Sequence, residues 1–282
     1  MDTGFAEPAR SAPEAPTVSS RVWPQMPAVC INLERRPDRK QNALGLAKEL
    51  GLQDMRIITA VDGQQLLKSG GRAYQASNAN GCPKFLMLWD DAGRSEQHAC
   101  CGGRGAKNGT ADIWALLGCT LSHEVALKAL ADMMDSSDCD AGLVLEDDTC
   151  IRAGLSAEDL NGQVRGIINT LDTRFPNWAL LQLNGKPVDR WAKRTRNGMV
   201  FDDVGVSEKV YLSNAYIIRR HAVDSLLVKL KSGMTADGAL VSFQGDCIRA
   251  GTPQATFWTN PPVLIQNKAL GREIATTTPR KG

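Results

Sequence analysis

Aromatic residues and histidines are scarce in this chain of 282 residues. Phe, Trp and Tyr together make up 5% of it, and it has three His. So few His give little material for a Ser-His-Asp triad or for a histidine-rich metal centre. An excess of one charge is also lacking, because 33 Lys and Arg face 31 Asp and Glu. This near balance argues against a dedicated nucleic-acid-binding protein.

Long apolar runs and paired cysteines are missing as well. No run approaches the ~20 apolar residues that span a bilayer, so we expect no transmembrane segment. The eight cysteines form no CxxC pair, which argues against a structural zinc site and favours reduced thiols. Residues 1–27 are rich in Ala, Pro, Ser and Glu and lack the apolar core of a signal peptide. We therefore expect a disordered leader there and a cytoplasmic protein.

Short apolar runs do alternate with amphipathic helical patterns along the chain. The runs lie at residues 28–33, 56–61, 142–145, 178–183, 210–218 and 256–258. This alternation predicts an α/β fold, with a mainly parallel central sheet flanked by helices. We expect one domain over residues 28–270 and a frayed tail over residues 271–282. Within the domain, residues 67–112 are rich in Gly, Ser, Asn and Cys and read as an enlarged insertion.

Three adjacent carboxylates follow the apolar run that ends at Leu145. Alternation along an extended chain would place Glu146 and Asp148 on one face and Asp147 on the other. Ligands of parallel α/β sheets bind beyond the carboxyl ends of the strands. A carboxylate pair there suits Mg²⁺ or Mn²⁺ shared with substrate phosphates. The alternative is a solvated acidic turn or a helix N-cap.

Five segments in chain order resemble the motifs of glycosyltransferase family 25, the lipopolysaccharide-biosynthesis and procollagen galactosyltransferase family. The five segments are residues 31–39 (INLERRPDR), 60–63 (AVDG), 118–123 (GCTLSH), 145–148 (LEDD) and 211–220 (YLSNAYIIRR). A further segment, at residues 262–263, resembles the terminal motif of that family. The resemblance covers roughly residues 28–266 and departs from the family in the insertion at residues 67–112.

The resemblance implies a GT-A fold and a metal-dependent, inverting glycosyltransferase. Such an enzyme moves a sugar, commonly galactose, from a UDP-sugar to a hydroxyl of a glycan or protein acceptor. Glu146 and Asp148 would hold the Mn²⁺ or Mg²⁺. Two alternatives remain open: a catalytically inactive GT-A-like binding or scaffold protein, and a metal-dependent phosphohydrolase that uses the same acidic cluster.

The resemblance also implies residues that contact the donor. They are Asn32, Arg35, Arg39, Asp62, Ser122, His123 and Asp147. A guanidinium fork can grip a diphosphate through two hydrogen bonds. For each group a structural role is the alternative: an exposed helix start for the arginines, an Asp-Gly turn for Asp62, and a satisfied structural histidine for His123.

Inversion further requires a carboxylate that deprotonates the acceptor hydroxyl. Asp237 matches a family position where an Asp opens a late helix, and we expect it to be this catalytic base. It could instead be the N-cap of that helix or a further metal ligand. Asp246 is the other carboxylate near the same helix.

Overall fold

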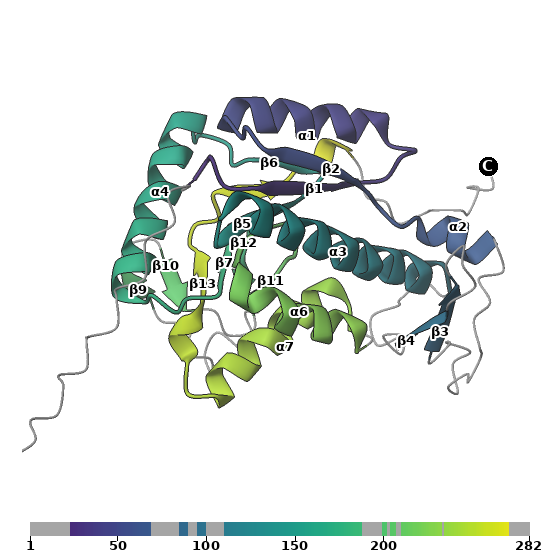
Figure 1. Ribbon diagram of the computed structural model, residues 1–282. Coiled ribbons are helices and arrows are strands. Elements are labelled where there is room, and N and C mark those ends of the chain that lie inside the picture. The colour runs from purple at the N-terminus through teal and green to yellow at the C-terminus, as the bar shows by residue number, and fades with distance from the viewer. Residues whose placement is uncertain are drawn as a thin grey trace, which may run out of the picture.

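A sheet of eight strands forms the centre of the protein in the computed structural model (Figure 1). The structure describes residues 23–68, 85–89, 95–99, 110–187, 199–201, 204–206, 210–232 and 234–270. From edge to edge the strands are β2 (Met55–Thr59), β1 (Ala28–Asn32), β5 (Ala141–Glu146), β12 (Ala215–Arg219), β7 (Leu180–Gln182), β13 (Thr256–Thr259), β10 (Val204–Val206) and β9 (Met199–Phe201).

Most strands of this sheet run in the same direction. β2, β1 and β5 are mutually parallel, and so are β7 and β13. β12 is antiparallel to both β5 and β7, so these two point the same way. At the far edge β10 is antiparallel to β13 and to β9. The expected α/β architecture is confirmed, and the sheet is mixed because β12 and β10 run against the others.

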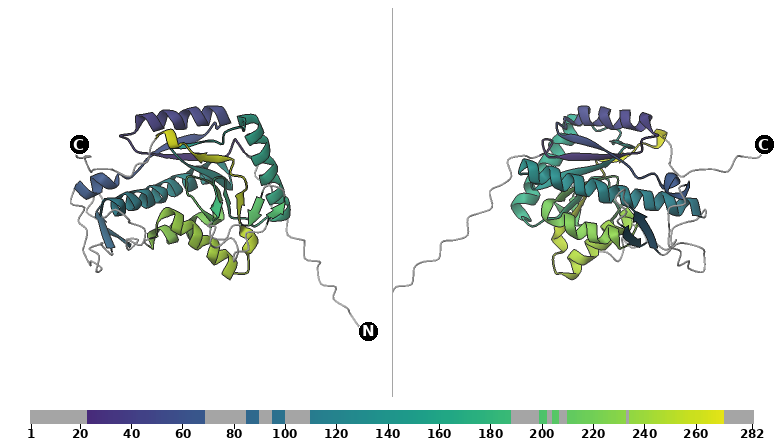
Figure 2. Two further views of the ribbon diagram at one scale, coloured as in Figure 1. Left: turned by 180° about the vertical axis from the view of Figure 1, so that it is seen from behind. Right: turned by 45° about the vertical axis from the view of Figure 1, so that its right-hand side comes forward.

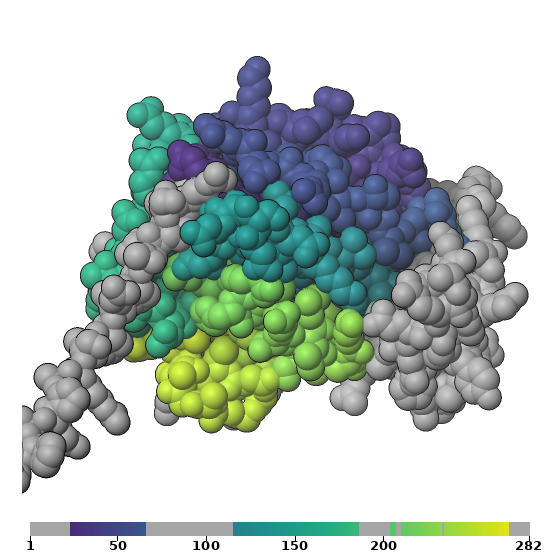
Figure 3. Space-filling model, in the orientation of Figure 1, coloured from purple at the N-terminus to yellow at the C-terminus, as the bar shows by residue number. Residues whose placement is uncertain are grey.

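Helices cover both faces of the sheet (Figures 1 and 2). α1 (Pro37–Leu50) and α4 (Ala157–Arg174) share one apolar cluster with Cys30 and Leu145. α3 (Thr110–Ser137), α6 (Arg220–Lys231) and α7 (Ala236–Arg249) share the other cluster with Val29 and Val144, and Figure 3 shows these three helices side by side. Because both faces are buried, each central strand is a continuous apolar run in the sequence.

Local sequence signals set several helix boundaries as expected. Pro37 begins α1 at a position where its missing N–H costs no hydrogen bond. Gly51 ends α1 with a φ of 71°, a left-handed conformation that glycine adopts without strain. Ser156 caps α4 by accepting a hydrogen bond from the backbone N–H of Asp159 at 3.1 Å.

The predicted strand over residues 210–218 is broken into two. β11 (Val210–Tyr211) leaves the main sheet and pairs with β8 (Lys186–Pro187), and β12 begins only at Ala215. The break coincides with Leu212, whose φ is 87°, a conformation that ends extended structure. A second small ladder, between β6 (Thr149–Ile151) and β14 (Leu264–Gln266), was not expected. Both features place polar groups at the carboxyl edge of the sheet.

The expected leader over residues 1–27 is wrong at its carboxyl end. Trp23 and Met26 are buried in the apolar cluster beneath α1 and α4, and the Trp23 indole donates a hydrogen bond to Asn161 at 2.7 Å. The prediction was based on the average composition of residues 1–27, which is rich in Ala and Pro, and so did not take account of these two large apolar side chains. Residues 1–22 and the predicted tail at 271–282 lie outside the described part of the chain.

The predicted insertion at 67–112 lies mostly outside the described residues. Within it the structure gives the end of α2 (Gly63–Lys68), an antiparallel pair of β3 (Phe85–Trp89) and β4 (Ser95–Ala99), and the start of α3. Two short 3₁₀ turns, Pro253–Ala255 and Lys268–Leu270, complete the described elements. Across the described residues, none of the helices combines the length and apolar character needed to traverse a bilayer.

Candidate active site

The carboxyl ends of two neighbouring parallel strands meet at the centre of the site. β1 ends at Asn32 and β5 at Glu146, and the register pairs Ile31 with Glu146. The two residues after β5, Asp147 and Asp148, form the tight turn into β6. The structure thus brings the first motif and the acidic motif together, as expected for a parallel sheet.

Asp147 points toward the α1 side of the sheet and is held there by two partners. Its Oδ2 accepts a hydrogen bond from Asn32 Nδ2 at 2.7 Å, and its Oδ1 lies 3.1 Å from Arg39 Nη1. The same Nη1 is 3.4 Å from Asp148 Oδ2. Arg39 is 5% exposed, so its charge acts inside the protein, where it offsets the repulsion between the two aspartates.

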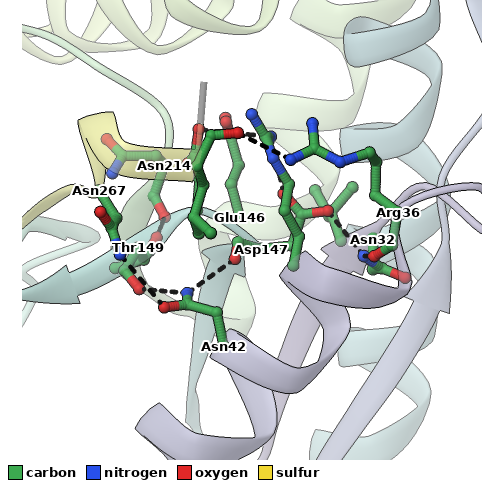
Figure 4. A network of polar contacts seen from close by, with 12 residues as sticks. Asn32, Arg36, Asn42, Glu146, Asp147, Thr149, Asn214 and Asn267 are labelled. Carbon is green, nitrogen blue, oxygen red and sulfur yellow. Dashed lines mark hydrogen bonds and ion pairs between the residues drawn. The ribbon is translucent and has the colours of Figure 1, made fainter. Parts of the chain in front are cut away.

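The backbone of the acidic turn is fixed from two other parts of the chain (Figure 4). Asn42, on α1, donates hydrogen bonds to the carbonyl oxygens of Asp147 at 2.9 Å and Thr149 at 3.0 Å. The N–H of Asn267, after β14, donates to the carbonyl of Asp148 at 2.6 Å. The turn therefore presents its carboxylates in a defined position.

Glu146 points the other way, toward α3. Its Oε1 lies 3.2 Å from His123 Nε2 and accepts a hydrogen bond from the Ser213 hydroxyl at 3.1 Å. His123 is 2% exposed, and its Nδ1 is 3.2 Å from the Tyr216 hydroxyl. Burial raises the pKa of Glu146, but the hydrogen bonds from His123 and Ser213 outweigh it, so this pKa lies below its ordinary value.

Asp148 is a buried carboxylate with a raised pKa. Burial, and after it the charge of Glu146, raise the pKa of Asp148 to about 7, although Arg39 opposes the shift. Its Oδ1 is buried and has no hydrogen-bond partner among the described residues. The strand ends at Glu146, so the alternation of side chains expected for an extended chain does not reach Asp148. Asp148 instead faces Arg39 and remains close enough to Glu146 to be affected by its charge.

Asp237 belongs to the same group of carboxylates, and it is not the N-cap of α7. Thr235 is that cap, accepting a hydrogen bond from the Gly238 N–H at 3.0 Å. Burial and the charge of Glu146 raise the pKa of Asp237, against hydrogen bonding to Ser213. Its Oδ1 is also buried, without a hydrogen-bond partner in the part of the chain described. Asp246, by contrast, lies on the surface and pairs with Lys229 and Arg249.

The carboxylates suit a hard divalent cation. Glu146 is the common neighbour, because its charge acts on both Asp148 and Asp237. Buried carboxylate oxygens without partners are rare in folded proteins unless an ion or water completes them. Oxygen-rich sets of this kind are what Mg²⁺ and Mn²⁺ prefer. Binding of Mn²⁺ or Mg²⁺ by Glu146 and Asp148 stays a prediction.

The remaining predicted donor residues lie in the loop after β2 or contact it. Arg35 Nε is 2.7 Å from Asp62 Oδ2, and Asp62 Oδ1 accepts a hydrogen bond from the Gln64 N–H at the start of α2. Ser122 accepts a hydrogen bond from the Val61 N–H at 2.8 Å and donates to Gly118 at 2.6 Å. Ser122 thus positions the loop that carries Asp62. For Arg35 and Asp62 a donor contact stays a prediction.

Close packing of α3 on this loop gives a stability prediction. A Cβ at Gly118 would lie 2.6 Å from the Val61 carbonyl and 2.8 Å from the Gly63 nitrogen, both backbone atoms. We expect Gly118→Ala to lower the free energy of unfolding by about 1–3 kcal/mol, measured by urea denaturation. The matched control is Gly166→Ala on the exposed face of α4, where no atom lies within 4 Å. The free energy of unfolding of that variant should rise by roughly 0.5–1 kcal/mol. If both substitutions changed the free energy of unfolding equally, the packing argument would be contradicted.

Several residues of the site carried no role in the sequence prediction. Ser213 follows the break before β12, which no local pattern signalled. Tyr216 was part of a family motif without an assigned function, and Asn42 gave no signal within α1. Cys119 could have been found from its spacing, because it precedes His123 by four residues on one helix.

Comparison with known proteins gives no family assignment. No protein-family model matches the chain, and neither does any curated protein sequence. Inferences about function therefore depend on the arrangement of the site and on the sequence motifs.

Proposed function

We propose that this protein is a metal-dependent glycosyltransferase that moves a sugar from a UDP-sugar to a hydroxyl of a glycan or protein acceptor, with galactose the sugar that the motif resemblance favours. The observation that carries the proposal is the electrostatic coupling of Glu146 with Asp148 and with Asp237, close to the carboxyl end of β5. Two of their oxygens, Asp148 Oδ1 and Asp237 Oδ1, are buried without a hydrogen-bond partner among the described residues.

Glu146 and Asp148 would hold Mn²⁺ or Mg²⁺, and a bound ion would neutralise the charge that develops on the departing diphosphate. Asn32 and Arg39 fix the turn that carries the second of these ligands. Arg35, between β1 and α1, pairs with Asp62, between β2 and α2, and this pair would contact the nucleotide. The protein thereby supplies a preorganised charge distribution on the donor side.

Asp237 would act on the acceptor side. Its raised pKa brings it closer to neutrality, where a general base is most effective. In the transfer step Asp237 takes the proton of the acceptor hydroxyl, and the acceptor oxygen forms a bond to the anomeric carbon. The bond from that carbon to the diphosphate breaks, and its electron pair leaves with UDP.

Binding of UDP with and without Mn²⁺ tests the proposal directly. We expect calorimetry to show UDP binding that depends on Mn²⁺ and is lost with a chelator. Asp148→Ala should weaken it by about 10-fold or more. Asp54→Ala, at an exposed position before β2, is the control and should bind like the wild type. Unchanged UDP affinity after chelation would remove the metal from the proposal.

The products separate transfer from hydrolysis of phosphate esters. With UDP-galactose and Mn²⁺ a glycosyltransferase releases UDP, and a labelled sugar appears on the acceptor or, in its absence, slowly on water. A phosphohydrolase releases inorganic phosphate or UMP instead. Release of inorganic phosphate from simple phosphate esters at comparable rates would favour the hydrolase.

A further inference from the structure

A second set of ligands adjoins the carboxylates on the α3 side. Cys119 and His123 are four residues apart on α3, so their side chains project from the same face of the helix toward Glu146. One ligand atom from each of these three residues lies within 4.8 Å of the others. A thiol, an imidazole and a carboxylate form a set typical of Zn²⁺, whereas Mg²⁺ and Mn²⁺ prefer oxygen ligands.

The distance between the imidazole and the carboxylate matches the requirement of a tetrahedral ion. Two ligand atoms bonded to Zn²⁺ at about 2.0–2.1 Å lie about 3.3 Å apart at the tetrahedral angle. His123 Nε2 and Glu146 Oε1 are 3.2 Å apart. In the free protein the Nε2–H of His123 donates to Glu146. When an ion binds, Nε2 becomes a ligand and the ring proton resides on Nδ1, which can donate to the Tyr216 hydroxyl 3.2 Å away. Zinc-binding histidines are commonly oriented by such a second partner.

We infer that Cys119, His123 and Glu146 form a binding site for Zn²⁺ or an ion of similar softness. On binding, the Cys119 thiol loses its proton to solvent and the thiolate sulfur becomes a ligand, with water as the fourth. Glu146 is shared with the proposed Mn²⁺ site, so occupation by Zn²⁺ withdraws a ligand from that site. This last step, inhibition of Mn²⁺-dependent UDP binding by Zn²⁺, rests on the proposed function.

Co²⁺ is the probe, because a thiolate bound to Co²⁺ gives a charge-transfer absorption band. The starting protein is the full chain with Cys82→Ser, Cys100→Ser and Cys101→Ser, which removes the thiols outside the described residues. We expect one equivalent of Co²⁺ to produce the band and Zn²⁺ to abolish it by displacement. Cys119→Ser should eliminate the band and lower Zn²⁺ affinity by about 100-fold or more. Cys139→Ser changes a buried thiol two residues after the end of α3 and is the matched control, which should keep both the band and the Zn²⁺ affinity.

Two further measurements keep the test decisive if Cys119→Ser fails to fold. X-ray absorption of the starting protein with one equivalent of Zn²⁺ should show one sulfur ligand among nitrogen and oxygen ligands. Tyr216→Phe, which removes only a hydroxyl from a buried ring, should lower Zn²⁺ affinity by about 10- to 100-fold. A zinc shell without sulfur, or a Co²⁺ band that persists in folded Cys119→Ser, would overturn the site.

The two proposals fail separately. If UDP binding proves independent of Mn²⁺ while the Co²⁺ band appears and depends on Cys119, the zinc site stands and the proposed function falls. If UDP binding needs Mn²⁺ but the Co²⁺ band is absent, the proposed function stands and the zinc site falls. If both are present and Zn²⁺ leaves Mn²⁺-dependent UDP binding unchanged, the sharing of Glu146 is wrong.

Discussion

Replacing Asp237 by asparagine is expected to lower the rate of sugar transfer by about 10² or more, while UDP and Mn²⁺ still bind. An amide has nearly the same shape as the carboxylate but cannot take the proton of the acceptor hydroxyl. The fold should not suffer, because Thr235 rather than Asp237 caps α7, and because the change removes a charge that Glu146 repels. The measurement is the transfer rate under saturating UDP-galactose, with metal and UDP affinities determined alongside.

Two control variants define what this result means. Asp246→Asn makes the same change on the surface of the same helix, where the carboxylate pairs with Lys229 and Arg249, and should transfer at the wild-type rate. Thr235→Ala removes the actual cap and should cost about 1 kcal/mol of stability without a comparable loss of rate. If Asp237→Asn transfers normally, Asp237 is not the base; if Mn²⁺ binding falls together with transfer, it is a metal ligand.

Asp148→Asn is expected to stabilise the metal-free protein, by up to about 4 kcal/mol at pH 8. In the folded protein the pKa of Asp148 is about 7, above its ordinary value, because of burial and the charge of Glu146. Between about pH 4 and pH 7 the folded state therefore keeps a proton that the unfolded chain releases. Rising pH favours the unfolded chain over this window and has no further effect above it.

The asparagine side chain cannot ionise, so the free energy of unfolding of the variant should exceed that of the wild type only slightly near pH 4. The difference should grow to its full value above pH 7. Urea denaturation in the presence of a chelator measures the difference at each pH. Asp54→Asn, at an exposed position, should show no such growth. Mn²⁺ should stabilise the wild type and leave Asp148→Asn unaffected. A difference that is constant from pH 4 to pH 8 would show that Asp148 ionises normally.

Local signals in the sequence predicted the architecture well. The strands β1, β5 and β7 were visible because a strand buried on both faces is apolar throughout. The ends of α1 were visible because Pro37 and Gly51 act within one turn of the chain. The break before β12 was not visible, because Leu212 is a non-glycine residue with positive φ. The ladder of β6 and β14 was not visible, because these strands are too short to show an alternating pattern.

The site could be predicted in position but not in detail. A parallel sheet puts the carboxyl ends of β1 and β5 at the same edge, whereas their pairing as neighbours, which brings Asn32 to the acidic motif, depends on the strand order. Contacts such as that of His123 with Tyr216, which are 93 residues apart, depend on how α3 packs over β12 and leave no local trace. The burial of Arg39 likewise leaves no local signal. From the sequence alone an arginine near the start of a helix is expected to be exposed, and its partners Asp147 and Asp148 lie more than a hundred residues away.

The hydrogen bond from Asn267 to the carbonyl of Asp148 has a consequence for biosynthesis. The acidic turn is made when about half of the chain has left the ribosome, whereas Asn267, one of the two residues that fix its backbone, comes more than a hundred residues later. Strand β6 has no ladder partner until β14 has been synthesised. During that interval the nascent chain already has Glu146, Asp148 and the hydrogen bonds from Asn42, but it lacks the backbone contact from Asn267 and the ladder with β14. Binding of a metal ion at this turn should therefore be among the last properties the growing chain acquires.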